Sequence, residues 1–410
     1  MNSKQSPSLR KSQWIVLLIV FLSTLIGYIA RMSVSVALKS ISQSFNWTTS
    51  EEGSLGGILL GIFLVSYGIS NIFLSPFIDK IGPKKVLSIS ILSWSLTLVL
   101  ASIFGHLYPM LLLSRVLLGL SQGVLFPVAN KITASWFSES KRAFATTVFL
   151  SGGPIGSLLT PLIVVPIIVK SSWQVSFYFI SILGIALIPF VVYFIKDNPT
   201  EQEQQKKDLN IQSNMKTLLF NREFQILLVG FITACTIWWG VSLWLPTYFL
   251  NAQGLTANEM SYATTLSYVG AIAGMIFASS ISEITKNRKN VIVSGLISAG
   301  ILILLLTLLH IQSKTIAVSM FFLIFFTGQM LPPIFFTIMQ TRISIQLVGT
   351  ATGLMNGLGN GFGTIGPILI GFIIALTGSY PLGLASVGVL ALIGGVVFLL
   401  FYKETDKLFI

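Results

Sequence analysis

Charged side chains are scarce in this chain. They make up only 9% of its 410 residues, and the mean hydropathy is +0.85. Soluble domains carry about 25% charged residues, so this composition excludes an ordinary soluble enzyme or binding domain. We conclude from composition alone that the protein is an integral membrane protein.

The usual signatures of catalysis are also missing. Cys235 is the single cysteine, which excludes an internal disulfide and a cluster of cysteine metal ligands. No nucleophile and base stand at a plausible spacing, and no Gly-rich loop is followed by Lys-Ser or Lys-Thr. We therefore expect no enzyme, no cofactor, no metal site and no use of ATP. Alternating-polarity strands are absent as well, which indicates an all-α protein.

The 13 acidic residues avoid the middle of every apolar stretch. Proton-driven carriers commonly rely on a buried carboxylate that loads and releases a proton during the cycle. Coupling through such a carboxylate is therefore not expected, and anion exchange or facilitated diffusion fits better. Entry of a proton on the substrate itself, or of sodium held by carbonyls, stays open.

What the chain does contain is apolar stretches long enough to cross a bilayer, which takes about 20 residues. They predict a polytopic membrane protein with twelve transmembrane helices at 14–38, 53–78, 86–105, 109–134, 143–169, 174–195, 224–250, 260–282, 291–310, 315–339, 348–376 and 382–402. The first stretch lacks a small-residue cleavage site and is read as a retained span.

The basic residues show how these spans are oriented. With a cytoplasmic N-terminus, most of the 25 Lys and Arg residues fall on cytoplasmic loops and tails; the exceptions are Lys39, Lys170 and Lys314 outside, and Arg31, Arg115 and Lys131 within spans. This asymmetry predicts a multi-pass protein of the cytoplasmic (inner) membrane with both termini in the cytoplasm. It also explains the net charge of +12 without nucleic acid, so we expect the lipid bilayer as partner and a monomer.

The chain divides into two similar halves. A polar connection at 196–223 separates residues 1–195 from residues 224–410, and each half holds six of the expected spans. A small residue, an acid and a basic cluster recur at 75–85 and 279–289, and glycine-rich runs recur in the fifth and eleventh spans. We expect two pseudo-symmetric six-helix bundles, which is a transporter architecture.

Arg31 is the main site candidate. A cation in the hydrocarbon costs about 2.5–3.5 kcal/mol on insertion scales, and such residues face a bundle interior or a watery cavity. Tyr28 lies on the same helix face as Arg31. Arg115 is a second buried cation, either a ligand for the substrate or a structural residue held by backbone carbonyls. A guanidinium binds a carboxylate or phosphate through two parallel hydrogen bonds, so we expect a small anionic substrate.

Several neutral side chains extend this candidate site. Trp238 and Trp239 lie near the middle of the seventh span, either as cavity wall or as interface anchors. Asn356 is an amide in the eleventh span, where the glycines indicate close helix packing and not a phosphate loop. Lys131 lies near the cytoplasmic end of its span and is expected to snorkel to the interface.

Along nearly its whole length the chain resembles the major facilitator superfamily, and within it the anion:cation symporters that include bacterial sugar-acid transporters. The superfamily loop motif is matched by Asp79-Lys80-x-Gly82-x-Lys84-Lys85. The symporter motifs are matched by Tyr28-x-x-Arg31, Arg115-Val-Leu-Leu-Gly119-Leu, Phe126-Pro127-x-x-Asn130, Trp136-Phe137 followed by Lys141-Arg142, Ser151-Gly152 and Trp244-Leu-Pro246-Thr-Tyr248.

The resemblance implies further site residues, and the departures from it are informative. Tyr67 and Asn71 match a family position that is usually tyrosine and glutamine, where the pair contacts either the ligand or a neighbouring helix. Ala30 stands where proton-coupled relatives have an aspartate, and Gln122 where they have a glutamate. Both departures remove an ionisable acid, since a glutamine side chain cannot ionise.

A second group is expected to act as a conformational latch at the cytoplasmic ends of the second and eighth spans. It comprises Asp79, Lys80, Lys84, Glu283 and Arg288. Acids beside basic clusters at these places favour contacts between the halves that stabilise one access state.

Together these features predict a secondary or facilitative carrier that moves a small organic anion, such as a sugar acid, by alternating access. Three alternatives stay open at this point. They are an organophosphate/phosphate antiporter, a drug or lipid efflux carrier, and an anion sensor that signals through the 196–223 segment without transport.

Overall fold

The computed structural model describes residues 7–196, 211–285, 287–309, 311, 313–344 and 347–403, and in these residues the chain is helical without strands. The helices of the first half are α1 (Pro7–Ser44), α2 (Thr49–Phe73), the 3-10 turn η1 (Ser75–Phe77), α3 (Ile78–Ile81), α4 (Pro83–Phe104), α5 (Tyr108–Gln122), α6 (Leu125–Trp136), α7 (Glu139–Lys170) and α8 (Trp173–Phe194). Those of the second half are α10 (Ile211–Phe220), α11 (Arg222–Asn251), α12 (Ala257–Thr285), α13 (Arg288–Leu308), α14 (Lys314–Gln329), α15 (Leu331–Arg342), α16 (Val348–Phe362), α17 (Ile365–Thr377) and α18 (Tyr380–Phe401).

Twelve stretches of the described chain are long and apolar enough to cross a membrane, so the predicted all-α fold with twelve spans is confirmed. The reason for the helices is physical. No water is available in the hydrocarbon to pair with peptide groups, so each span must satisfy its own backbone hydrogen bonds, and a helix does this within one segment.

Three of the spans are not continuous helices, in contrast to the uninterrupted stretches expected at 109–134, 315–339 and 348–376. The breaks fall at Gly123 between α5 and α6, at Met330 between α14 and α15, and at Gly363 between α16 and α17. At the second break, Pro332 lies at the start of α15 and lacks the N–H group that would continue the helix.

Side chains of neighbouring helices satisfy the carbonyls around the break at Gly123. Ser70 Oγ donates to the Leu120 carbonyl at 2.6 Å, and Ser90 Oγ donates to the Ser121 carbonyl at 2.6 Å. Buried backbone groups need such partners because an unpaired group costs about 1–3 kcal/mol. The break is therefore a stabilised element of the fold.

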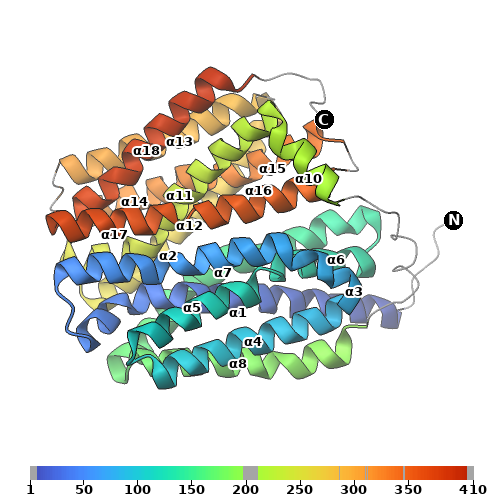
Figure 1. Cartoon of the computed structure of the whole chain (residues 1–410), viewed down its shortest axis with the longest axis horizontal. Helices are drawn as coiled ribbons and strands as arrows, with labels where there is room; N and C mark the ends of the chain where they lie inside the picture. The colour runs from blue at the N-terminus through green and yellow to red at the C-terminus, as the bar shows by residue number, and fades with distance from the viewer. Residues whose placement is uncertain are drawn as a thin grey trace.

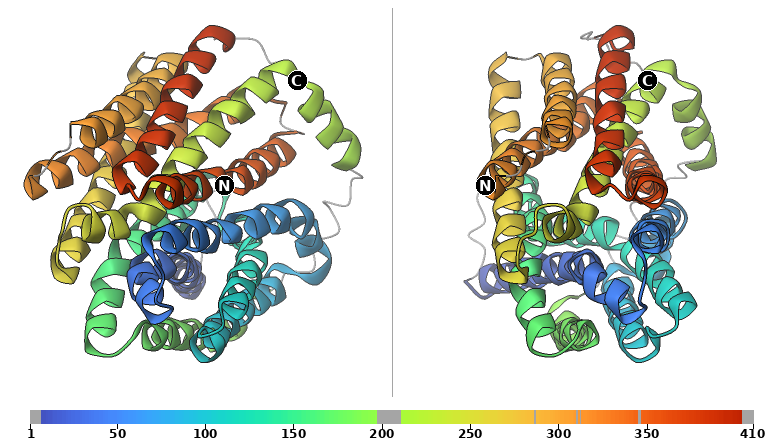
Figure 2. Two further views of the ribbon diagram at one scale, coloured as in Figure 1. Left: turned by 60° about the vertical axis from the view of Figure 1, so that its left-hand side comes forward. Right: turned by 90° about the vertical axis from the view of Figure 1, so that its left-hand side faces the viewer.

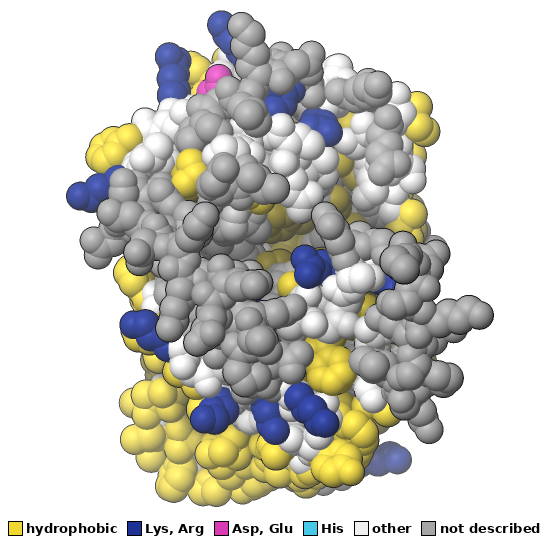
Figure 3. Space-filling model, turned by 90° about the vertical axis from the view of Figure 1, so that its right-hand side faces the viewer, with side chains coloured by type: hydrophobic (Ala, Val, Ile, Leu, Met, Phe, Trp, Pro, Cys, Tyr) yellow, Lys and Arg dark blue, Asp and Glu magenta, His cyan; other side chains and the backbone are white. Residues whose placement is uncertain are grey.

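The helices run side by side in two groups. In Figure 1 the blue to green helices lie below and the yellow to red ones above, and the views in Figure 2 show the same separation. The start of α1 and the end of α18 lie toward the same end of the molecule, on the right in Figure 1, which we call the terminal end. Figure 3 looks onto it and shows Lys and Arg side chains around a recess between the two groups.

The two groups meet along four pairs of packed helices. α2 packs against α16 and α17, α7 against α12, and α1 against α11. The α2–α17 contact is tight because glycines face each other: a Cβ atom on Gly371 would lie 2.2 Å from the Gly53 carbonyl oxygen. This contact lies toward the end of the molecule opposite the terminal end, which we call the opposite end.

Because backbone atoms fill the space beside Gly371, Gly371→Ala is expected to push α2 and α17 apart. Overpacking of this kind costs about 1–3 kcal/mol, so the apparent melting temperature of the purified protein should fall. Gly353→Ala in α16 is the matched control, since a Cβ atom there meets nothing within 4 Å. Equal melting temperatures of the two variants would contradict this account of the interface.

Candidate functional site

Arg31 is buried at mid-depth between the two groups of helices, with 3% of its surface exposed. Its guanidinium carbon lies 4.3 Å from the ring centroid of Tyr28 and 4.7 Å from that of Tyr67. Phe63 at 4.9 Å and Trp239 at 5.6 Å complete a cage of four rings. A desolvated cation gains about 2 kcal/mol or more from such faces. Because Trp239 belongs to α11, the cage joins both halves of the chain.

Gln122 is the polar partner of Arg31 and is itself fully buried. Arg31 donates from Nε and Nη2 to Gln122 Oε1, at 3.3 and 3.2 Å. The Gln122 amide donates from Nε2 to the Gly27 carbonyl at 3.0 Å, which determines which way its oxygen points. Gln122 is also the last residue of α5 and directly precedes the break in this span.

Arg115 lies on the same side of the site but has a different role in this conformation. Its Nη2 donates to the backbone carbonyl of Arg31 at 3.1 Å, and its guanidinium carbon lies 5.3 Å from the Phe63 ring. Its Nε is buried and has no hydrogen-bond partner among the described residues. This geometry favours the structural reading of Arg115, as a cation held by a backbone carbonyl. Within the described chain, neither buried arginine is ion-paired with a carboxylate.

A chain of hydrogen bonds connects the cage to the second half of the molecule. Trp239 Nε1 donates to Asn360 Oδ1 at 2.8 Å, and Asn360 Nδ2 donates to Asn356 Oδ1 at 3.0 Å. Asn356 Nδ2 in turn lies 3.5 Å from the Tyr67 hydroxyl. The predicted residues Tyr67, Trp239 and Asn356 are therefore brought together. Asn360 was not among the predicted site residues, although it lies one helical turn after Asn356.

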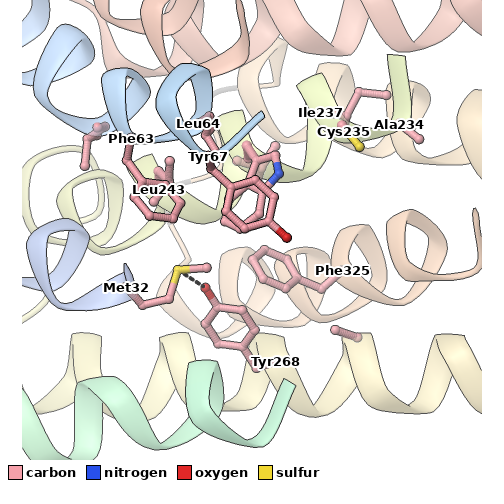
Figure 4. Close-up of a cluster of buried hydrophobic side chains, with 14 of the residues drawn as sticks. Met32, Phe63, Leu64, Tyr67, Ala234, Cys235, Ile237, Leu243, Tyr268 and Phe325 are labelled. Carbon is pink, nitrogen blue, oxygen red and sulfur yellow. Dashed lines mark hydrogen bonds between the residues drawn. The ribbon is translucent and has the colours of Figure 1, made fainter. Parts of the chain in front are cut away.

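Trp238 forms part of a separate aromatic wall. Its ring centroid lies 5.2 Å from that of Phe325 and 6.0 Å from that of Tyr268. Figure 4 shows Tyr268 and Phe325 opposite Met32 of α1 and the α2 side chains Phe63 and Tyr67. The Tyr268 hydroxyl donates to the Met32 sulfur at 3.6 Å. Rings from α11, α12 and α14 thus close this region against α1 and α2.

Asn71 points away from the cage, in contrast to Tyr67. Its Nδ2 donates to the Gly123 carbonyl at 2.9 Å, so it bonds a neighbouring helix at the break in the fourth span. Within the part of the chain that the structure describes, its Oδ1 is buried without a hydrogen-bond partner. The structure therefore places Asn71 as a support for the segment that carries Gln122.

The structure describes the side chains of only three of the five expected latch residues. The side chains of Asp79 and Glu283 lie outside the described residues. Lys80 lies with Nζ 5.5 Å from the Phe77 ring, and Lys84 lies on the first turn of α4. Arg288 donates to Thr341 Oγ1 at 2.6 Å, a contact within the second half. The latch at the terminal end stays a prediction.

A buried polar cluster joins the halves at the opposite end, and sequence reasoning missed it. Glu52, only 2% exposed, accepts hydrogen bonds on Oε1 from Asn251 Nδ2 at 2.8 Å and from the Tyr380 hydroxyl. Lys39 Nζ lies 3.7 Å from Glu52 Oε2. We call these four residues the Glu52 cluster. One signal was present in the sequence: of the adjacent acids, Glu51 alone is needed for the capping box with Thr48.

Twelve spans around a buried, caged arginine define a polytopic membrane protein with a central site. The chain belongs to the Major Facilitator Superfamily, whose profile matches residues 20–365. It is therefore a membrane transporter of that superfamily, and the predicted family is confirmed.

Curated relatives match the chain over nearly its whole length. It is 28% identical to a hexuronate transporter of Bacillus subtilis, over 95% of this chain and 94% of that protein. It is also 28% identical to a probable sulfoacetate transporter of Cupriavidus necator (94% and 93% covered) and 24% identical to a D-galactonate transporter of Escherichia coli (97% of each). The crystal structure of a bacterial homologue of the human lysosomal transporter Spinster has the same fold, with a TM-score of 0.77 at 15% identity over 97% of both chains.

We predict that the Glu52 cluster keeps the two halves of the chain in contact at the opposite end. Glu52→Gln removes the ion pair with Lys39 and the charge on the hydrogen bonds from Asn251 and Tyr380. Hydrogen bonds to charged groups contribute about 1.5–3 kcal/mol, so closure at the opposite end should weaken roughly 10- to 100-fold. A Ser35→Cys reporter, introduced together with Cys235→Ser, should then react faster with a maleimide.

Ser35 suits this measurement because it is buried at the contact of α1 with α11, where its hydroxyl donates to the Leu243 carbonyl at 2.7 Å. Glu51→Gln is the matched control, since Glu51 is the adjacent acid and is exposed. If both variants label Ser35→Cys at the same rate, the Glu52 cluster does not hold this end closed.

Proposed function

We propose that this transporter is a secondary carrier that binds a small organic anion of the sugar-acid class at Arg31 and moves it across the membrane by alternating access. The observation that carries the proposal is the state of Arg31. Its guanidinium is desolvated at mid-depth, is caged by rings from both halves and has a neutral amide as its polar partner.

The missing negative charge indicates what the site binds. A buried cation without a counter-ion is costly, and an anionic ligand is the simplest source of compensation. A guanidinium suits planar acidic groups because it donates two parallel hydrogen bonds. The hexuronate, galactonate and sulfoacetate named for the relatives are all small organic acids.

The neutral groups around Arg31 fit a hydroxylated anion better than a purely apolar one. Asn356, Asn360, Tyr67 and Trp239 form a connected chain of hydrogen bonds beside the cage. Amides and hydroxyls of this kind both donate and accept, as sugar hydroxyls do. We assign the acid group of the substrate to Arg31 and its hydroxyls to this chain.

The conformation supports alternating access. From the basic residues of the loops we infer that the terminal end lies in the cytoplasm. In our proposal the recess in Figure 3 therefore faces inward and the Glu52 cluster closes the outer side. Substrate would leave or enter at the cytoplasmic side in this state. Rocking of the two bundles must then break the bonds of Glu52 and open the other side of the same site.

Coupling does not run through a carboxylate beside Arg31. Ala30 is fully buried, and the residue that bonds to Arg31 is Gln122, whose side chain cannot ionise. Within the described chain, no carboxylate forms an ion pair with Arg31 or Arg115. Anion exchange or facilitated diffusion follows as the mode of transport in our proposal.

Arg31→Ala should abolish anion binding, and Arg31→Lys should weaken it because an ammonium cannot reproduce the two-pronged hydrogen bonding. For Arg31→Lys, the strength of hydrogen bonds to charged groups predicts a loss of about 10- to 100-fold in anion affinity. The measurement is thermal stabilisation of the purified protein by D-galactonate, glucuronate, sulfoacetate and phosphate, with glucose as the uncharged control.

Arg222→Ala is the matched control for Arg31→Ala, since Arg222 is an exposed arginine at the terminal end of α11. Counterflow of the stabilising anion in proteoliposomes then separates a carrier from a sensor, because a sensor binds without exchange. The proposal is wrong if no anion stabilises the native protein, or if stabilisation survives the loss of Arg31.

Gln122→Glu should convert the site into a pH-dependent one. The new carboxylate would ion-pair with Arg31 and compete with the substrate, so anion affinity should fall at neutral pH. As the pH is lowered the carboxyl group takes up a proton, the competition ends, and affinity should recover. Anion affinity is measured between pH 5 and pH 8, with exposed Gln225→Glu as control. A pH profile of Gln122→Glu as flat as that of Gln225→Glu would contradict the assigned geometry.

A further inference from the structure

A groove on the outside of the first half is not part of the anion site. It has a volume of about 760 Å³ and lies between α4 and α5, with η1 and α3 at its cytoplasmic end. Among the described residues, its walls are apolar except for a few hydroxyls, and no charged side chain lines it; the lining residues include Leu74, Phe77, Ile81, Val86, Ser93 and Leu100.

The groove has the dimensions and setting of an acyl-chain site. Val86 and Leu100 both line it along α4, and 14 residues of helix span about 21 Å. One leaflet of the hydrocarbon core is about 15 Å deep. Phe77, Ile81 and Ile89, which also line the groove, are exposed on the outer surface of the protein. The groove therefore opens to the bilayer and reaches from its cytoplasmic boundary past the midplane.

Basic side chains gather at the cytoplasmic end of this groove. Lys80 directly precedes the lining residue Ile81, and its Nζ lies 5.5 Å from the ring of Phe77, another lining residue. Lys85 is exposed and directly precedes the lining residue Val86. Residues 79–86 contain three lysines, Lys80, Lys84 and Lys85, and one aspartate, Asp79. A polar head group above the groove would thus meet a net positive charge.

We propose that this groove binds an anionic glycerophospholipid of the cytoplasmic leaflet, with an acyl chain between α4 and α5 and the phosphate at Lys80 and Lys85. Apolar burial holds the chain, and each lysine near the membrane surface attracts anionic lipid. A zwitterionic lipid fits the groove equally well but gains less from the lysines.

The lipid would touch the broken span that serves the anion site. Leu117, Leu120, Ser121 and Val124 line the groove and flank Gln122 and Gly123. Ser90, another lining residue, donates to the Ser121 carbonyl. On the inner side of the same break, Gln122 holds Arg31. An acyl chain in the groove therefore supports the geometry of this break from outside.

The proposal is tested by lipid retention, which requires no knowledge of the transported anion. The full-length protein is equilibrated in micelles with equal amounts of dioleoyl phosphatidylglycerol and dioleoyl phosphatidylcholine, and retained lipid is measured by native mass spectrometry. We expect preferential retention of phosphatidylglycerol. Lys80→Gln and Lys85→Gln should each reduce this preference about fivefold, while Lys141→Gln, an exposed lysine of α7, should not.

Ser93→Phe tests the acyl-chain position, because the new ring would occupy the groove. Its matched control is Leu92→Phe, the neighbouring residue of α4, which is exposed but does not line the groove. Ser93→Phe should lose the retained lipid and Leu92→Phe should keep it. Soluble glycerol 3-phosphate should not displace the lipid, since it lacks acyl chains.

Three results would overturn the proposal. One is equal retention of the two lipids, which removes the role of the lysines. Another is full retention in Ser93→Phe, which removes the groove. The third is a dimer that Ser93→Phe dissociates, which would assign the groove to a second copy of the chain. None of these results depends on whether Arg31 binds an anion.

Discussion

The buried charge of Arg31 is the constraint on which the rest of this structure depends. In a bilayer its hydration must be replaced, and the protein does so with the amide oxygen of Gln122 and four aromatic faces. These partners come from α1, α2, α5 and α11, so both halves of the chain must converge on one point. The break in the fourth span directly follows Gln122, and Ser70, Ser90 and Asn71 donate to the carbonyls around it.

Glu52 and Arg31 carry opposite charges at different depths of the molecule, and the groups that compensate these charges differ. The buried carboxylate of Glu52 is paired with the half-exposed Lys39 and accepts hydrogen bonds from Asn251 and Tyr380, so its charge is compensated and its bonds join the halves. Within the described residues, the guanidinium of Arg31 is compensated only by neutral groups. A fully paired ion stabilises one conformation, whereas an unpaired one leaves part of its interaction energy for a ligand. In our proposal, the paired carboxylate of Glu52 therefore holds the halves closed, and the guanidinium of Arg31 in the same interface binds the anion.

Much of the fold was predictable because the membrane imposes simple rules. Scarce charge, apolar stretches of sufficient length and basic loops indicate the spans and their orientation without any knowledge of packing. Arg31 could be selected as a candidate site residue for the same reason, since a cation in hydrocarbon requires an explanation. The breaks at Gly123, Met330 and Gly363 were not, because glycine and proline occur in many continuous transmembrane helices, as Pro154 and Pro161 do in α7.

The sequence by itself determined the class of protein, the number of spans and the presence of basic residues within them, because hydropathy and charge are local properties of the chain. Only the tertiary structure decided what each polar group pairs with. It assigned Arg115 to a backbone carbonyl, Asn71 to the broken span and Glu52 to the closure, and it added Asn360 to the site. These roles depend on contacts between residues up to 328 positions apart. Such pairings depend on how the helices pack, and no local pattern of residues specifies them.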